Sequence, residues 1–200
     1  MKHFITIASA ALIGMSFAGL AHAAGMSKEA QIDQAVSALP QSLRAGATVV
    51  SYSPKGMPMV LRRGSNDVIC NPNRAGGKGF RVICYGKALE RQMNMQARLT
   101  AEGKDMKATR AAIAEARKSG ELPTPPMGTT IYVRSGKTEA AAHGLWVVLL
   151  PNAKAEDLGL PTKRGHGSPW MMLSGTPNAH IMVPQMTSTN AAMKSSSHKM

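Results

Sequence analysis

The sequence predicts an α+β fold in which an antiparallel sheet packs against two or three helices and carries one disulfide-linked hairpin. Three observations predict it. Segments with the three- and four-residue spacing of an amphipathic helix share the chain with short segments rich in β-branched residues. The two cysteines, Cys70 and Cys84, each end a Val-Ile-Cys triplet. There is no internal repeat apart from that doubled triplet, and the length of the chain supports a single domain, which we expect over residues 24–185.

The first helix is expected over residues 27–39, where apolar side chains recur at intervals of three and four. Ser27 is its expected N-cap, and Pro40 ends it. Residues 47–52 and 59–62 have the composition of two strands, which a Pro-Lys-Gly turn joins. The two cysteine strands follow.

Two consecutive basic helices are expected next, over residues 87–102 and 106–118. Gly103 ends the first helix, and Asp105 caps the second. The side chains of the second helix that we expect to face inward are Ala112, Ile113 and Ala116, and those that we expect to face outward are Lys107, Arg110, Arg117 and Lys118.

After a proline-rich linker, residues 129–133 and 145–150 are expected strands. The second is apolar on both faces, which is typical of a strand in the middle of a sheet. A loop or one helical turn comes next, and two short strands, residues 165–172 and 179–184, then flank a turn. Residues 186–200 are small and polar, and we expect them to be disordered.

The first 23 residues have the pattern of a Sec-type signal peptide. Lys2 precedes an apolar run over residues 4–20, and the following Ala-His-Ala is a small-x-small cleavage pattern. The run is near the lower limit for a membrane span, which needs about 20 apolar residues. We expect cleavage after Ala23 and export to the periplasm or the medium; an uncleaved anchor is the alternative.

The chain is strongly basic, with 24 Lys and Arg against 11 Asp and Glu and a formal net charge of +13. This balance favours anionic envelope polymers or lipids as partners, although a solvated basic surface is its commoner meaning. Nucleic acid is disfavoured by the expected export and by the few aromatic side chains. The candidate anion-binding residues are Arg74, Lys78, Arg81, Arg91, Arg98 and Arg110.

In an oxidising compartment a disulfide is the expected state of Cys70 and Cys84. A closed loop of about fifteen residues stabilises a fold by about 3 kcal/mol in the chain-entropy model. The Cys-x-x-Cys spacing of a redox site is absent, and there is no second pair of thiols to complete a zinc site.

The two C-terminal strands contain the candidate ligand-binding site. Residues two apart in a strand share a face, so Trp170 lies with Met172, and His180 lies with Met182. If the strands pair, these four side chains form one surface. Imidazole and thioether groups suit Cu(I), so His180 and Met182 are candidate copper ligands. The competing interpretation is that the Met and Trp side chains fill the core.

The sequence contains no complete catalytic constellation. His166 and Ser168 suggest a base and a nucleophile, but the Gly-x-Ser-x-Gly pattern and a paired-carboxylate spacing are both absent. We therefore do not expect an enzyme; a hydrolase that uses His166 or His180 is the alternative.

Residues 167–184 contain Gly-x-Pro-Trp-x-Met followed by Gly-Thr-Pro-x-Ala-His-x-Met-x-Pro. Together with the earlier Ser-Asn-Asp-Val-Ile-Cys-Asn-Pro, this pattern resembles an uncharacterised family of small secreted bacterial proteins over about residues 30–185. The resemblance implies no activity and no catalytic residue. It implies that Trp170, His180 and Met182 belong together.

These observations lead us to expect an exported, non-enzymatic protein that binds a ligand or an anionic envelope component. A periplasmic copper-binding protein is the first alternative, and a hydrolase with a histidine base is the second. Copper is the one cofactor that the sequence suggests.

Overall fold

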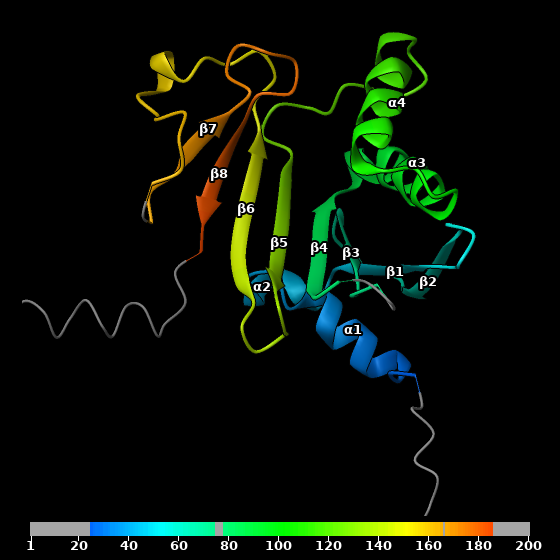
Figure 1. Cartoon of the computed structure of the whole chain (residues 1–200). Coiled ribbons are helices and arrows are strands. Elements are labelled where there is room, and N and C mark those ends of the chain that lie inside the picture. Colours follow the sequence, from blue (N-terminus) through cyan, green and yellow to red (C-terminus); the bar gives the residue numbers. More distant parts are fainter. Residues whose placement is uncertain (1–24, 75–77, 166, 186–200) are drawn as a thin grey trace, which may run out of the picture.

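One sheet forms the centre of the fold (Figure 1). The computed structural model describes residues 25–74, 78–165 and 167–185, and the strands in them have the order β2-β1-β3-β4-β5-β6-β8-β7. The strands are β1 (Thr48–Tyr52), β2 (Pro58–Arg62), β3 (Val68–Asn71), β4 (Phe80–Gly86), β5 (Thr130–Gly136), β6 (His143–Leu149), β7 (Trp170–Met172) and β8 (His180–Pro184). The described residues also form four α-helices, which confirms the predicted α+β class.

The sheet is mixed, whereas the sequence predicted an antiparallel one. β1 and β3 run parallel, with Val49 beside Cys70, and the other neighbouring strands are antiparallel. The chain reverses into β2 at the edge, reverses again, and enters the sheet on the other side of β1. The amides of Ser65 and Asn66 hold this return segment by donating to the carbonyl oxygen of Gly46, at 2.8 and 2.9 Å. Two reversals make β3 parallel to β1.

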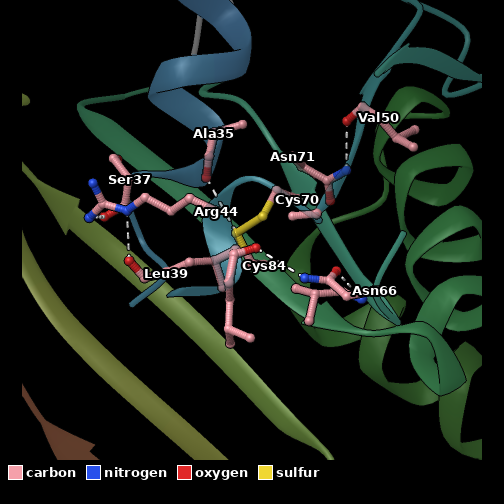
Figure 2. Close-up of a disulfide and its surroundings, with 12 residues drawn as sticks. Ala35, Ser37, Leu39, Arg44, Val50, Asn66, Cys70, Asn71 and Cys84 are labelled. Atoms are coloured by element: carbon pink, nitrogen blue, oxygen red, sulfur yellow. Dashed lines mark hydrogen bonds between the residues drawn. A yellow bond between two sulfur atoms is a disulfide. The ribbon is translucent and has the colours of Figure 1, made fainter. Parts of the chain in front are cut away.

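The helix α1 (Lys28–Val36) covers one face of the sheet beside the two cysteines (Figure 2). As predicted, Ser27 is its N-cap: the Oγ atom accepts a hydrogen bond from the amide of Ala30 at 3.1 Å. Ala35 is fully buried and packs in the same cluster as Val49 of β1. Burial of this apolar side holds the helix on the sheet.

A short helix, α2 (Gln41–Arg44), follows Pro40 and was not predicted. Its last residue closes the turn between α1 and α2, because the Nε atom of Arg44 donates to the carbonyl oxygen of Leu39 at 2.9 Å. Four residues are too few for periodicity to indicate a helix in the sequence.

Cys70 and Cys84 lie opposite each other in the β3–β4 pair, and their sulfur atoms are bonded. Their Cα atoms are 4.0 Å apart, and both side chains are 0% exposed. The predicted disulfide is therefore confirmed. Figure 2 shows the Sγ atom of Cys84 facing the carbonyl oxygen of Ala35, at 3.3 Å. Because a disulfide sulfur has no proton, this is a packing contact between α1 and the sheet. The connection between β3 and β4 includes residues 75–77, which lie outside the described part of the chain.

Two helices lie on the opposite face of the sheet from α1. A 3₁₀ turn, η1 (Lys87–Leu89), leads from β4 into α3 (Glu90–Ala101), and α4 (Met106–Lys118) follows. The bounds of α4 are those predicted, and the Oδ1 atom of Asp105 caps it by accepting from the amide of Ala108 at 2.7 Å.

The helix α3 is held against the sheet at two places. Met93 packs on the buried side chains of Tyr85 and Leu89. Since Tyr85 follows Cys84 in β4, the two side chains point to opposite faces. At the β1–β2 turn, Gly56 has φ +75°, and an added Cβ atom would lie 2.6 Å from the carbonyl oxygen of Ala97. Only glycine allows this turn to approach α3 so closely.

The C-terminal strands complete the sheet. β6 lies between β5 and β8, as its apolar sequence predicted, and β7 pairs with β8 at the edge. A single 3₁₀ turn, η2 (Glu156–Leu158), occurs in the segment before β7. The predicted signal peptide, residues 1–23, and the predicted tail, residues 186–200, lie outside the described residues. In the part that the structure describes, no helix is both long and apolar enough to cross a membrane.

Candidate functional site

A cleft lies between the helix pair α3–α4 and the sheet. Its volume is about 740 Å³, which is within the range of small-molecule sites. The side chains that line it come from both helices, from β4, β5 and β6, and from the turn between β7 and β8. The cleft therefore forms only when segments distant in the sequence pack together.

One face of α4 forms a wall of this cleft. Met106, Arg110, Ile113 and Arg117 line the cleft and follow one another at intervals of four, three and four residues, which is the spacing of neighbours on a helix face. Ile113 is buried between the two arginines. Arg110 and Arg117 are seven residues apart, or about 10 Å along the helix axis. The wall thus presents two cations separated by an apolar side chain.

Arg117 connects three elements at this wall. Its Nη1 atom donates to the Oδ1 atom of Asn178 in the β7–β8 turn, and its Nη2 atom donates to the Oε1 atom of Gln92 on α3, each at 2.5 Å. Both acceptors are uncharged amides, and the two ion pairs found among the described residues involve other groups. The Nε atom is buried and has no hydrogen-bond partner among the described residues. Burial also lowers the pKa of Arg117. A partly desolvated guanidinium without a counter-charge favours an anion nearby.

His180 lines the cleft at the start of β8, and its Nδ1 atom is 2.7 Å from the carbonyl oxygen of Asn178. A carbonyl oxygen only accepts hydrogen bonds, so Nδ1 carries a proton and Nε2 is the ring nitrogen left for other contacts. Asn178 thus positions Arg117 through its side chain and His180 through its backbone.

The remaining lining combines apolar and cationic groups. The apolar floor consists of Leu89, Ile131 and Leu149, and Ile113 of the α4 wall adds apolar surface to it. The cations are Arg81, Lys104, Arg110 and Arg117. None of the described residues that line the cleft is Asp or Glu. The Nη2 atom of Arg110 contacts the Sδ atom of Met106 at 3.0 Å, and a thioether is a weak acceptor. The charged side chains that line the cleft are therefore all cationic.

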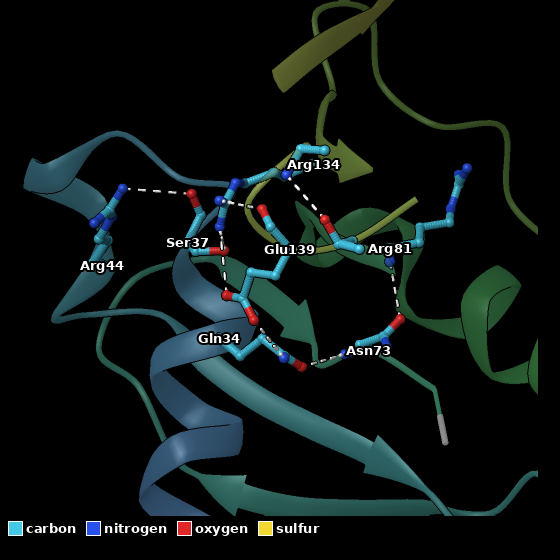
Figure 3. A network of polar contacts seen from close by, with 9 residues as sticks. Gln34, Ser37, Arg44, Asn73, Arg81, Arg134 and Glu139 are labelled. Atoms are coloured by element: carbon cyan, nitrogen blue, oxygen red, sulfur yellow. Dashed lines mark hydrogen bonds and ion pairs between the residues drawn. The ribbon is translucent and has the colours of Figure 1, made fainter. Parts of the chain in front are cut away.

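A polar network fixes the position from which Arg81 reaches the cleft (Figure 3). The amide of Arg81 donates to the Oδ1 atom of Asn73 at 2.9 Å, and the amide of Asn73 donates to the Oε1 atom of Gln34 at 3.1 Å. The Nε2 atom of Gln34 then donates to the Oε2 atom of Glu139 at 3.0 Å. In Figure 3 the Arg81 side chain extends away from this network. The network joins α1, the β3–β4 loop and the β5–β6 turn. It uses only the backbone amide of Arg81, and the Arg81 side chain lines the cleft.

An exposed leucine stands at the rim of the cleft. Leu173 is 54% exposed and has φ 55°, in the left-handed region that costs an ordinary residue about 1–2 kcal/mol. The amide and hydroxyl of Thr176 both donate to the carbonyl oxygen of Leu173, at 3.1 and 2.7 Å, and hold this conformation. Backbone strain of this kind is concentrated at functional sites.

The register of β7 and β8 places the four predicted ligand-site residues on one face. Trp170 lies opposite Met182, and Met172 lies opposite His180. Their surroundings differ. Trp170 is 6% exposed, and the guanidinium carbon of Arg164 is 5.6 Å from its ring centroid, whereas Met172 is 41% exposed. His180 is the member of this set that lines the cleft.

The six predicted anion-binding residues are distributed over three places. Arg81 and Arg110 line the cleft. The other four lie elsewhere: Arg91 and Arg98 at a second cavity of about 290 Å³, and Arg74 and Lys78 on the exposed loop between β3 and β4.

The prediction that Arg117 faces outward was wrong, since this side chain lines the cleft and bridges α3 to the β7–β8 turn. The sequence contains a signal for the observed direction. Arg117 follows Ile113 by four residues, and residues four apart lie on one side of a helix. Because the Arg117 side chain is charged, it was assigned to the solvent-facing side in spite of this periodicity.

No three His, Cys, Asp or Glu side chains are grouped as metal ligands among the described residues. Of the predicted hydrolase residues, His166 lies outside the described part of the chain, and Ser168 is exposed. The copper and hydrolase interpretations stay predictions.

Comparison with known proteins found no matching family model, no matching curated protein and no matching solved structure.

Proposed function

We propose that the chain is an exported, non-enzymatic protein that binds an anionic ligand in the cleft between α3–α4 and the sheet. The observation that carries this proposal is the lining of the cleft: four cations surround an apolar floor, and none of the described lining residues is acidic. Charges of one sign in a cleft with apolar walls concentrate ligands of the opposite sign.

Export is supported by the signal-peptide pattern of residues 1–23 and by the disulfide, which persists in oxidising compartments. The resemblance to small secreted bacterial proteins agrees with this location and stays a prediction. Binding without catalysis is proposed because the sequence contains no complete catalytic constellation.

The test uses 1-anilino-8-naphthalenesulfonate, an anionic probe whose fluorescence rises in apolar surroundings. We expect it to bind the mature chain and to bind more weakly as salt is added, because salt screens the attraction between charges. Arg110→Gln should weaken binding about fivefold, which corresponds to a partly exposed ion pair of about 1 kcal/mol.

Lys107→Gln is the matched control, because Lys107 is an exposed residue of the same helix that does not line the cleft. Both variants remove one positive charge from α4, so they change the net charge equally. Equal affinities of the two variants, or binding that salt does not alter, would contradict an anion site in the cleft.

Copper binding is a second candidate, favoured by the register that places His180 opposite Met172 and on the same face as Met182. Titration with Cu(I) against a competing chelator tests it. His180→Ala should weaken binding by at least tenfold, while His143→Ala, at an exposed position on β6, should leave it unchanged. Micromolar or weaker affinity that neither variant alters removes this candidate.

A further inference from the structure

We infer that the anionic ligand is an amphiphile with a single alkyl chain: the chain lies on the apolar floor of the cleft, and the head group contacts the arginines of α4. This inference rests on the proposed function and specifies the chemical class of the ligand at the same site.

The floor of the cleft requires an apolar partner. Leu89, Ile131 and Leu149 approach it from η1, β5 and β6, and Ile113 approaches it from α4. Leu89 and Ile113 are already buried by the fold, whereas Ile131 and Leu149 are only partly buried. A small polar anion such as sulfate would leave the remaining surface of these two side chains in contact with water or with the polar ligand. An alkyl chain would instead cover them, and the free energy of transfer out of water favours that arrangement.

The walls require an anionic head group. The guanidinium of Arg110 donates to a thioether, and that of Arg117 donates to two uncharged amides, so neither charge is neutralised by an ion pair among the described residues. Ile113 lies between the two on the same helix face. A head group bound to either arginine therefore has apolar surface directly beside it, which is the arrangement that an amphiphile needs.

The size of the cleft limits the ligand to a small molecule. A volume of about 740 Å³ suits a drug-sized compound, which such sites largely enclose. A two-chain phospholipid and an envelope polymer are larger than this class. The rim agrees with an apolar occupant, because Met106 and Leu173 both line the cleft and are 69% and 54% exposed.

The experiment measures the affinity of the mature chain for n-alkyl sulfates of increasing length by calorimetry, below their micelle concentrations. Each added methylene should tighten Kd about fourfold until the chain fills the cleft. Inorganic sulfate provides the head group alone and should bind far more weakly. The n-alkyl glucosides provide the same chains with a neutral head, and they should bind at least tenfold more weakly than the sulfates.

Two variants locate the site. Ala114→Trp places a large side chain in the cleft, because Ala114 lines it, and should abolish binding of the longer sulfates. Ala111→Trp makes the same change at an exposed position of α4 outside the cleft and should leave binding unchanged. Both alanines are exposed, so neither change disturbs the buried core.

The outcomes separate this inference from the proposed function. Suppose that the alkyl sulfates bind with the same affinity at every chain length, while the naphthalenesulfonate still binds Arg110→Gln more weakly than Lys107→Gln. This result would overturn the inference and keep the proposed function. If neither probe binds in a variant-sensitive way, both are wrong. Alkyl glucosides that bind as tightly as the sulfates, or Ala114→Trp with unchanged affinity, would also overturn the inference. The affinities for decanoate and for a decanoyl lysophosphatidate are measured in the same way. The ligand with the lower Kd indicates whether the natural amphiphile is a fatty acid or a lysophospholipid.

Discussion

Replacing Cys70 and Cys84 by alanine should lower the free energy of unfolding by about 5 kcal/mol. The disulfide closes a loop with a sequence separation of 14 residues, and a loop of that length contributes about 3 kcal/mol through the entropy of the unfolded chain. Both side chains are fully buried in the cluster beneath α1, so each alanine also removes a packed sulfur atom, at about 1 kcal/mol each. A loss of 5 kcal/mol approaches the whole stability of many domains, so the variant should be partly unfolded.

Urea unfolding followed by tryptophan fluorescence measures this loss, and the reduced wild-type chain separates its two parts. Reduction without mutation removes only the loop constraint, so we expect a loss of about 3 kcal/mol. The buried sulfur atoms should make that reduction slow in native buffer and faster as urea opens the structure. The double alanine variant provides the control, since reductant must leave its stability unchanged. A reduced wild-type chain with the urea midpoint of the oxidised chain would refute the reasoning.

Three further changes test the elements around the cleft. In thermal unfolding, Gly56→Ala should lower the stability by well over the roughly 1 kcal/mol expected for Gly103→Ala. Both glycines have positive φ, but a Cβ atom at Gly56 would meet the backbone of α3, whereas a Cβ atom at Gly103 would meet nothing within 4 Å. Equal losses would show that the close approach is unimportant. Asp105→Ala should destabilise the fold by about 1 kcal/mol in urea, because α4 loses its N-cap, and Asp105→Asn should restore most of that loss; an alanine variant of unchanged stability would contradict the cap. Burial raises the pKa of Tyr85 above its ordinary value of 10.0, so the folded chain holds this proton more tightly than the unfolded chain. That contribution to stability is complete below about pH 10 and is lost as the pH rises further, so Tyr85→Phe should flatten the fall in urea midpoint above pH 10. An equally steep fall in the variant would exclude Tyr85 as its cause.

Local signals in the sequence predicted the secondary structure well where capping residues and periodicity agree. The helix α4 has the predicted bounds, because Asp105 precedes it with a side chain that caps the first turn and Gly120 follows it with positive φ. The helix α1 begins at the predicted cap, Ser27, but ends three residues earlier than predicted. The strand β6 lies inside the sheet, as its continuous apolar sequence indicated.

The order and direction of the strands were less predictable. The pairing of β1 with β3 depends on the return segment that binds at Gly46, and no side-chain periodicity reports such a contact. The sequence did not predict that β7 pairs with β8; it predicted only that Trp170, Met172, His180 and Met182 share a surface if the strands pair. They do pair, with Trp170 opposite Met182. Sheet register sets which side chains meet, and it follows from hydrogen bonds between distant segments.

The candidate site was predicted only in fragments. Arg81, Arg110 and His180 were chosen from the sequence for separate reasons, and the structure places all three around one cleft. Arg117 was assigned to the solvent, because an arginine in a basic helix is usually exposed. Its partners are Gln92 and Asn178, which come from α3 and from the β7–β8 turn.

The sequence by itself determined the class of fold, most of its helices and strands, and the disulfide, because propensity, capping and thiol chemistry act between residues that are near one another in the chain or of one distinctive type. Tertiary structure alone decided the parallel strand pair, the inward direction of Arg117 and the existence of the cleft. Each of these depends on contacts between segments distant in the chain, and a cleft is the space that remains after those segments have packed.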